Sequence, residues 1–269
     1  MEMVDKVLIE QIKEKYLNVT GFTGLKTGFK GIDSLTGGFA NGQLIVLGGR
    51  PGMGKTTFAC SLIDNICLND NKSCIFFSSE MTKKQTIDRL MQIHSNIKYH
   101  ERDPDEIADR LINSAAVMEK ANLWVDDGNV ATGEDFIESC REIGKQKRID
   151  LVIVDDLQLF VCKTKSLDRH YMELKRLAEE LNCPVVAFSK VNRTVENRTN
   201  HMPDISDLQD AKTAYRYADE ILFLYRDAYY DPDADRSKAV IKLAKHDHLW
   251  NMNISMRFDT EVFAFRDEG

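Results

Sequence analysis

Residues 49–56 constrain this chain more than any other feature of its sequence. They read GRPGMGKT and match the pattern G-x-x-x-x-G-K-[ST], whose backbone wraps a chain of phosphates. The apolar run 44–48 precedes them and a helix-forming run, 56–66, follows, which is the strand–loop–helix context that such a loop requires. Average residue frequencies make a chance match in a chain of this length rare, roughly one in a hundred. The sequence therefore predicts a phosphate-binding loop.

Each residue type in this loop suits one part of a nucleotide. Glycines let the backbone fold around phosphates, and the amides at the start of the following helix present positive dipole ends to them. Lys55 is expected to neutralise the β- and γ-phosphate oxygens, and the Thr56 hydroxyl is expected to ligate Mg²⁺. The full set of expected nucleotide-binding residues is Gly49, Arg50, Pro51, Gly52, Met53, Gly54, Lys55, Thr56 and Thr57.

Two carboxylates are expected at the edge of the sheet where this loop opens. The apolar run 151–154 ends in Asp155, which we expect to hold Mg²⁺ through a bound water. Asp156 would point to the opposite face if the strand continues, without a catalytic role. Glu80 follows the run FFSS and would accept a proton from the water that attacks the γ-phosphate, although a helix-capping or surface role fits the pattern equally well. Glu80, Lys55 and Asp155 are thus the expected catalytic residues.

Short apolar runs alternate with helical segments along most of the chain, which predicts an α/β fold. Such runs occur at 44–48, 73–78, 122–127, 150–156 and 184–189. Amphipathic segments such as 82–97 and 167–181 lie between them, so a mainly parallel central sheet flanked by helices on both faces is expected. Four further runs follow with little helix between them and predict antiparallel strands at the C-terminal end: 220–225, 239–244, 253–258 and 262–265.

The N-terminal segment predicts a separate helix. Apolar residues recur at spacings of three and four and give one stripe on a helix of about four turns; they are Val4, Val7, Leu8, Ile12 and Tyr16. Glycines at 21, 24, 28 and 31 indicate a flexible connector after it. The helix can pack on its own domain or on another subunit. We therefore divide the chain into an N-terminal linker helix, 1–20, and one larger domain, 21–269.

Composition restricts the partners and the compartment. The formal net charge of the 269 residues is −7, so any surface for nucleic acid must be local. No stretch approaches eighteen consecutive apolar residues and no signal peptide opens the chain, so we expect a cytoplasmic protein without a membrane partner. Six cysteines are scattered without C-x-x-C pairs, which predicts reduced thiols and no metal site of cysteine and histidine.

Six segments resemble, in order and over nearly the whole chain, the C-terminal motor domain of DnaB-type replicative helicases. They read TGFKGIDSLTGG, GGRPGMGKTTFA, FFSSEM, LVIVDDLQLF, LAEELNCPVVAFSKVNR and ADEILFLYRDAYYDPD. The resemblance implies a RecA-like fold and an ATP-driven hexameric ring that moves along single-stranded DNA. It assigns Lys55, Thr56, Asp155 and Glu80 the roles given above. It also implies that the linker helix packs on the adjacent subunit, and that replication proteins such as primase or a loader are partners.

The family's separate N-terminal domain is not part of this sequence, so either the sequence is a fragment or the native protein does without that domain. Three positions depart from the family's motor pattern. Lys190 stands where the family has a glutamine that senses γ-phosphate. The family's DNA-contacting run D-L-R-E-S-G reads DLQDAK at 207–212. The candidates for DNA contact are Arg193, Arg198, Gln209, Asp210 and Lys212. Loss of one phosphate-binding arginine is expected to weaken DNA binding.

The third departure concerns the residue that reaches into a neighbour's ATP site. The family has an arginine where this chain has Asp247, although Lys245 survives nearby. An absent arginine finger lowers turnover by about 10³-fold or more in related reactions, so reduced activity is expected. Two alternatives to a helicase motor follow: a weakly hydrolysing accessory protein of a replication complex, and a RecA-type recombinase or clock-like ATPase.

Overall fold

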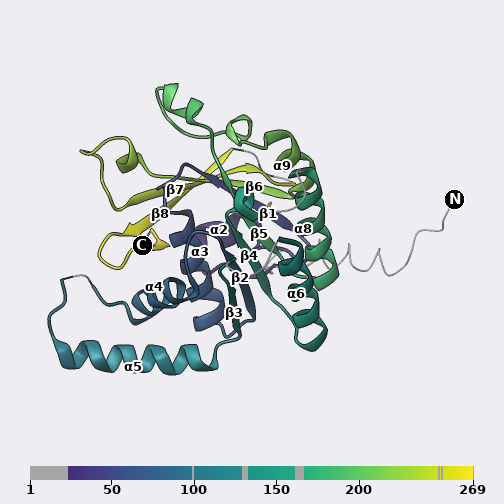
Figure 1. Ribbon diagram of the computed structural model, residues 1–269. Helices are drawn as coiled ribbons and strands as arrows, with labels where there is room; N and C mark the ends of the chain where they lie inside the picture. The colour runs from purple at the N-terminus through teal and green to yellow at the C-terminus, as the bar shows by residue number, and fades with distance from the viewer. Residues whose placement is uncertain are drawn as a thin grey trace.

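A single mixed sheet forms the centre of the protein. The computed structural model describes residues 24–98, 100–128, 133–160, 167–247, 249 and 251–268, with the side chains of 159 and 160 excepted. Within these residues the strands lie in the order β3-β2-β4-β5-β1-β6-β7-β8-β9 (Figure 1). Their bounds are β1 Leu44–Gly49, β2 Cys74–Ser78, β3 Leu123–Asp126, β4 Leu151–Asp155, β5 Val185–Lys190, β6 Glu220–Tyr225, β7 Lys238–Lys245, β8 Met252–Asp259 and β9 Ala264–Asp267.

The predicted parallel core and antiparallel C-terminal strands are confirmed. Strands β3, β2, β4, β5, β1 and β6 run parallel, and β7, β8 and β9 continue the sheet in antiparallel pairs. One detail of the prediction was wrong, because the run 220–225 was grouped with the antiparallel strands. Strand β6 is parallel to β1 and antiparallel only to β7. The short helix α9 (Ala211–Tyr217) precedes β6 and is part of the crossover that a parallel neighbour requires.

Helices cover both faces of the sheet. Helices α2 (Lys30–Thr36), α3 (Lys55–Ile63) with its π-helical continuation η1 (Asp64–Asn69), and α4 (Lys83–Ser95) lie on one face (Figure 1). Helices α6 (Gly133–Gln146), α8 (Leu167–Leu181) and α9 lie on the other. The remaining helices are α5 (Pro104–Lys120), which packs on α4, α7 (Leu157–Phe160), and the 3-10 turns η2 (Arg193–Asn197), η3 (Ile205–Asp207) and η4 (Asp227–Tyr229).

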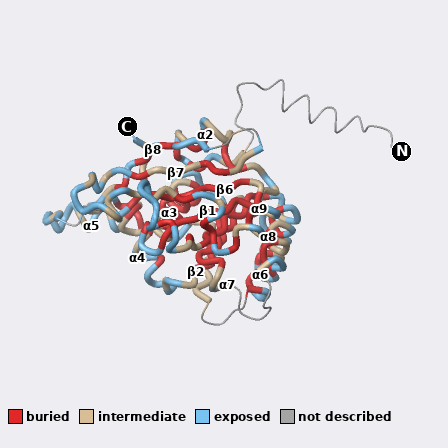
Figure 2. Tube along the Cα trace, turned by 90° about the horizontal axis from the view of Figure 1, so that it is seen from above, coloured by how far each residue is buried: buried red, intermediate tan, exposed pale blue. Residues whose placement is uncertain are grey.

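Strand β1 shows how this layering follows from the sequence. Successive side chains of a strand point to opposite faces. Leu44 and Val46 therefore join the apolar core under α6 and α8, whereas Ile45 and Leu47 join the core under α3. All four are fully buried, and Figure 2 shows the central strands as the most buried part of the molecule. Burying such a side chain contributes about 1.5–3 kcal/mol, which explains why the run has no polar residue.

The expected flexible connector is wrong from residue 24 onward. Leu25 forms a β-bridge with Phe39, and helix α2 packs its buried side on the domain. Gly28 has a φ of 77°, and a Cβ on Gly31 would lie 2.5 Å from the side chain of Ile254. These two glycines serve a left-handed turn and a close approach rather than flexibility. The expected helix over 4–16 lies outside the described residues.

Five cysteines lie in the described part of the chain, and all are buried and free. Cys162 falls outside it. No helix in the described ranges is long and apolar enough to cross a membrane.

Glu220, the first residue of strand β6, is a buried ionisable group. Its side chain is 1% exposed, and the imidazole Nε2 of His246 lies 3.6 Å from its Oε1. Burial, reinforced by the nearby charges of Asp219 and Asp247, raises the pKa of Glu220 to about 8, against a smaller opposite effect of a hydrogen bond from Gln43. The folded chain therefore keeps this proton over a pH range in which the unfolded chain has lost it.

This raised pKa predicts a pH-dependent cost to stability. The cost is absent below the ordinary pKa of 4.5 and grows as the pH rises toward about 8. Across this pH range, the free energy of unfolding of Glu220→Gln minus that of the wild-type chain is expected to rise by on the order of 3 kcal/mol. Urea denaturation at a series of pH values measures the difference. The exposed Glu142→Gln serves as control, and a difference for Glu220→Gln that stays constant with pH would contradict the assignment.

Candidate functional site

The phosphate-binding loop joins the end of β1 to the start of α3. Gly52 and Gly54 have φ values of 81° and 106°, in a region that residues with a Cβ rarely adopt. Gly54 is also the residue that precedes the first turn of α3, so the free amides of that turn face the loop. The loop thus has the backbone form and the helix N-terminus that bind a phosphate chain.

Lys55 lies buried against this loop. Its side-chain Nζ donates a hydrogen bond of 3.2 Å to the carbonyl oxygen of Gly49. Burial lowers the pKa of Lys55, and the carboxylates of Asp155, Asp156 and Glu80 act in the opposite direction. A buried ammonium of this kind gains from an anionic ligand, because a nearby negative charge offsets the cost of its desolvation.

Thr56 and Asp155 meet as the sequence predicts for a magnesium site. The Thr56 hydroxyl donates a 2.6 Å hydrogen bond to Oδ2 of Asp155, which is buried at the end of β4. Burial raises the pKa of Asp155 to about 6, while the Thr56 hydrogen bond and the charge of Lys55 act against this shift. A hydroxyl and a carboxylate are hard oxygen donors, and Mg²⁺ is usually held by one or two such groups together with phosphates. The residues therefore fit Mg²⁺.

Asp156 lies just beyond the end of β4, so the condition under which it was expected to point to the opposite face is not met. Strand β4 ends at Asp155, so the alternation on which that expectation relied stops there. The fully buried carboxylate of Asp156 lies 2.7 Å, through its Oδ2, from Nζ of Lys190 at the end of β5. The nearby Asp156 carboxylate raises the pKa of Lys190, so its ammonium is charged at neutral pH. Asp156 and Lys190 thus form an ion pair at the same edge as the loop.

Glu80 reaches this edge two residues after the end of β2. Its side chain is exposed, and its negative charge acts on Lys55, Asp155 and Lys190. The turn before it is fixed, because Ser79 donates both its amide and its hydroxyl to the carbonyl oxygen of Asp155, at 2.7 and 2.9 Å. The structure therefore brings together Glu80, Lys55, Thr56, Asp155 and Lys190, which the sequence placed there one by one.

Arg50 connects the loop to the segment that carries the candidate DNA contacts. Its guanidinium donates to the carbonyl oxygen of Val191 at 2.8 Å and makes two bonds, of 2.9 and 2.7 Å, to Oε1 of Glu196 in η2. The guanidinium is almost fully buried. Arg50 is therefore bound to protein partners, and it ties the loop to η2.

The five candidate DNA contacts divide into two groups. Arg193, Gln209 and Lys212 are exposed. Arg198 forms a pair of hydrogen bonds, 2.6 and 2.8 Å, with the buried carboxylate of Asp207. The fifth candidate, Asp210, is buried; its carboxylate accepts bonds from the Tyr171 hydroxyl at 2.6 Å and the Ser189 hydroxyl at 2.9 Å. Asp210 and Arg198 thus have partners within the fold, although the Arg198 side chain is still 41% exposed, and the other three present their side chains to solvent.

Lys245 lies at the opposite end of the sheet from the loop. It is the last residue of β7 and pairs with Ile221 near the start of β6, whereas the loop opens where the parallel strands end. Its Nζ donates to the carbonyl oxygens of Tyr215 and Ala218 at the C-terminal end of α9. In its own subunit Lys245 therefore stabilises a helix end and lies far from the phosphate-binding loop.

Two side chains at the site escaped the sequence analysis. A Cβ on Gly52 would lie 3.2 Å from the ring of Tyr229, which packs edge-on against Tyr230. The amide of Gln158 donates to the Ser189 hydroxyl at 2.9 Å and accepts from the backbone N–H of Lys190 at 3.2 Å. Both residues belong to motifs already quoted, and their position just after β6 and β4 was the available signal.

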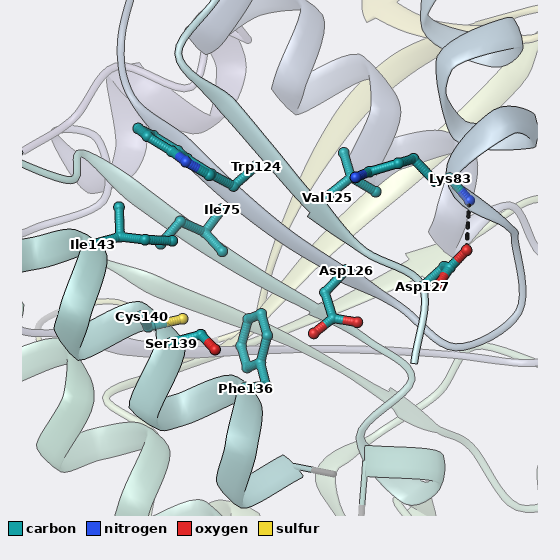
Figure 3. Close-up of a pocket in the computed structure, with 10 residues that line it drawn as sticks. All are labelled: Ile75, Lys83, Trp124, Val125, Asp126, Asp127, Phe136, Ser139, Cys140 and Ile143. Carbon is teal, nitrogen blue, oxygen red and sulfur yellow. Dashed lines mark hydrogen bonds between the residues drawn. The ribbon is translucent and has the colours of Figure 1, made fainter. Parts of the chain in front are cut away.

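A separate cavity of about 330 Å³ lies beside the edge strand β3. Its wall is formed by Ile75, Trp124 and Phe136, and Asp126 and Asp127 add carboxylates (Figure 3). The backbone N–H of Lys83 donates to Asp127 at 3.1 Å. None of the predicted site residues lines this cavity. The candidate site therefore rests on the geometry at the phosphate-binding loop.

Comparisons with known proteins agree with this geometry. The family model described as the DnaB-like helicase C terminal domain matches residues 24–267. The replicative DNA helicase DnaB of Haemophilus influenzae is 34% identical over 268 residues, which cover 94% of this chain and 57% of the relative. DnaB of Geobacillus stearothermophilus is 30% identical over 229 residues, 81% of this chain and 50% of the relative. The chain thus spans about half the length of the curated relatives it matches.

Solved structures show the same architecture. A solved ATPase domain superposes with a TM-score of 0.89 at 26% identity, and the match covers all of both chains. A DnaB-like replicative helicase, solved in a study of its interactions with primase, gives 0.88 at 27% identity and covers 100% of this chain and 68% of that one. The RadB recombinase, at 21% identity, shares the fold with a TM-score of 0.60. The chain therefore belongs to the DnaB-like helicase C-terminal domain family and has its RecA-like ATPase fold.

Proposed function

We propose that this chain is the ATP-hydrolysing motor domain of a replicative-type DNA helicase, which moves along single-stranded DNA as a homo-hexameric ring. The observation that carries the proposal is the contact of Thr56 with Asp155 beside the buried Lys55, at the mouth of a phosphate-binding loop. One cation beside a pair of hard oxygen donors suits the phosphates of ATP and their Mg²⁺, which supports the proposal.

Each residue of the site has a task in ATP hydrolysis. The backbone N–H groups of residues 50 and 52–55 and the Lys55 ammonium hold the phosphates, and Thr56 and Asp155 hold Mg²⁺. When bound, Mg²⁺ neutralises charge on the phosphate oxygens. Glu80 orients a water and takes its proton as the water oxygen bonds to the γ-phosphorus. The bond from that phosphorus to the bridging oxygen breaks, and ADP leaves with the electron pair.

Direct contacts link this site to the proposed DNA loop. The backbone N–H of Gln209 donates to the carbonyl oxygen of Lys190 at 3.1 Å, so a residue of the DNA loop is bonded to the end of β5. Arg50 makes a second link through Glu196. Movement of the loop around phosphates would therefore shift Arg193, Gln209 and Lys212, which supports a motor rather than a passive nucleotide-binding protein.

Assembly into a ring is supported by the surface of α5. This helix exposes Leu111, Ile112 and Val117, with exposed fractions of 36%, 66% and 36%. These side chains lie about 100–140° apart around the helix, so they share no single face, and the amphipathic segment 4–16 of a second copy would cover only part of this apolar surface. The DnaB-like neighbour extends the proposal to replication proteins such as primase or a loader as further partners, since that structure was solved in a study of interactions with primase.

A lysine variant tests the site. We expect Lys55→Ala to lower steady-state ATP turnover by about 10²–10³-fold, because the variant loses the buried charge that faces the phosphates. Turnover is measured at rising protein concentration, with and without single-stranded DNA. For the wild-type chain, we expect turnover to be higher with single-stranded DNA than without it. Turnover per subunit should also rise with protein concentration.

The matched control is Lys145→Ala, an exposed lysine on α6 that should leave turnover unchanged. Equal turnover of Lys55→Ala and the wild-type chain would contradict the assignment of the site.

A second variant tests the DNA loop. We expect Lys212→Ala to reduce the slope of log K against log salt for single-stranded DNA by about 0.7, the value for one lost phosphate contact. Asp210→Asn should leave this slope unchanged and lower the free energy of unfolding by about 1–3 kcal/mol, because it disturbs the buried bonds from Tyr171 and Ser189. Salt titrations by fluorescence anisotropy measure the slopes, again with Lys145→Ala as control. A slope for Lys212→Ala equal to that of the control would remove Lys212 from the DNA surface.

One observation favours a weakly hydrolysing accessory protein as the second candidate. Lys245 is bonded to the end of α9, and Asp247 stands where the family has an arginine, so the chain offers a neighbour no free cation at these two positions. The reduced turnover expected from the sequence stays a prediction. ATP binding without measurable turnover at any concentration would favour this candidate.

A further inference from the structure

The edge strand β3 has backbone groups that no other strand uses. Within the described residues β3 pairs with β2 alone, and it ends the sheet. The backbone N–H of Cys74 in β2 donates to the carbonyl oxygen of Asn122, so every second residue from 122 onward turns its backbone groups toward β2. The N–H and C=O groups of Leu123 and Val125 therefore face outward, and they have no hydrogen-bond partner in the part of the chain that the structure describes.

The apolar cavity of about 330 Å³ lies directly beside this edge (Figure 3). Ile75 on β2 and Trp124 on β3 line it from the sheet, and Phe136 and Ile143 line it from α6. Helix α6 connects β3 to β4, which is not the neighbour of β3 in the sheet. The helix therefore crosses over β2 and leaves β3 half-buried, with an apolar hollow that a side chain from another molecule can fill.

Two carboxylates line one end of this cavity. Oδ1 of Asp126 accepts the backbone N–H of Gly128 at 2.9 Å, and Oδ2 of Asp127 accepts that of Lys83 at 3.1 Å. These bonds hold both carboxylates at the C-terminal end of β3. Asp126 lies two residues beyond Trp124, so the two side chains share one face of the strand. The edge thus offers an apolar hollow and, beside it, negative charge that suits a basic side chain.

Charges along a short edge strand can also prevent unwanted pairing with other chains. Lys83 lines the cavity, and Nζ of Lys147 lies 5.8 Å from the centre of the Trp124 ring, so lysines as well as carboxylates surround this edge. Protection of the edge needs only these charges. It does not account for an open cavity lined by tryptophan, phenylalanine and isoleucine, because such a lining is stabilised only when an apolar group excludes water from it.

We propose that β3 and its cavity form a docking site for an extended segment of a partner protein, which adds as a strand to the outer edge of the sheet. Backbone hydrogen bonds to Leu123 and Val125 hold the segment, and a bulky apolar side chain opposite Trp124 enters the cavity. A basic residue two positions away in the segment pairs with Asp126. This site lies apart from the phosphate-binding loop, so the inference goes beyond the proposed function.

A random library of nine-residue peptides displayed on phage tests the proposal with the full chain as target. We expect the selected peptides to share a bulky apolar residue two positions from a lysine or arginine. The order of the two residues reports whether the added strand is parallel or antiparallel to β3. The most frequent peptide is then synthesised with a fluorescent label, and its Kd is measured by anisotropy.

Two variants block the site in different ways. Val125→Pro removes an outward N–H and leaves the bonds to β2 intact, as proline on an edge strand allows. Ser139→Trp fills the cavity from an exposed position on α6. We expect each variant to raise the Kd of the labelled peptide at least about tenfold. The matched controls are Val125→Ala, which keeps the N–H, and Lys145→Trp, at an exposed position of α6 outside the cavity.

The charge pair is tested by a double-mutant cycle. We expect Asp126→Asn, which keeps an acceptor for Gly128, to raise the Kd about threefold or more. Replacing the basic residue of the peptide by glutamine should have the same effect, and the two changes together should cost no more than either alone. Equal Kd values for Asp126→Asn and the wild-type chain would overturn the pairing with Asp126.

The remaining outcomes separate strand addition from other binding and from the ATP site. A library that yields no enriched peptide, or peptides that bind both blocking variants as tightly as the wild-type chain, overturns the docking site. A peptide lost in Ser139→Trp but retained in Val125→Pro overturns strand addition. Lys55→Ala should bind the peptide normally and Ser139→Trp should keep its ATP turnover, so the proposed function stands or falls separately.

Discussion

The hydrogen bond from Thr56 to Asp155 is the contact on which the arrangement of the site depends. Thr56 lies in the first turn of α3, after β1, and Asp155 ends β4, with β5 between these two strands. The bond forms only if β1, β4 and β5 run parallel and end at one edge, which requires the helical crossovers on both faces. The fully apolar interiors of these strands are therefore a condition for the chemistry at their ends.

Carboxylates and ammonium groups lie close together at this edge of the sheet. Asp155 and Asp156 are both buried, and each has a different partner: Asp155 accepts from a hydroxyl, and Asp156 faces the Lys190 ammonium. Burial raises the pKa of Asp155 to about 6, and the Thr56 hydrogen bond and the charge of Lys55 only partly offset this shift. A carboxylate with a neutral partner gains from a metal ion, whereas the paired Asp156 is already compensated. Two adjacent residues of one type thus take different roles because of their surroundings.

The sequence predicted most strands and helices correctly, but it predicted fewer of the contacts between side chains. Strands β1 to β5 were recognisable because continuous apolar runs ended in loop residues, and the positions of Lys55, Thr56, Asp155 and Glu80 followed from the direction of the strands. Helix α2 was missed because its glycines, which serve a turn and a close approach, look like those of a flexible segment. The pair of Asp156 and Lys190 could not be predicted, because it joins residues far apart in the chain after the strand alternation has stopped.

The placement of the DNA loop follows from the same edge of the sheet. Strand β5 ends at Lys190, and the chain then runs through η2 and η3 before Gln209 returns to bond with the Lys190 carbonyl oxygen. Arg198 with Asp207, and Asp210 with Tyr171, fix the interior of this loop. A segment with a fixed interior and two attachments to the phosphate-binding region moves as a unit when that region moves. The ion pair of Arg198, whose side chain is 41% exposed, and the buried Asp210 therefore hold the exposed residues of this segment in place.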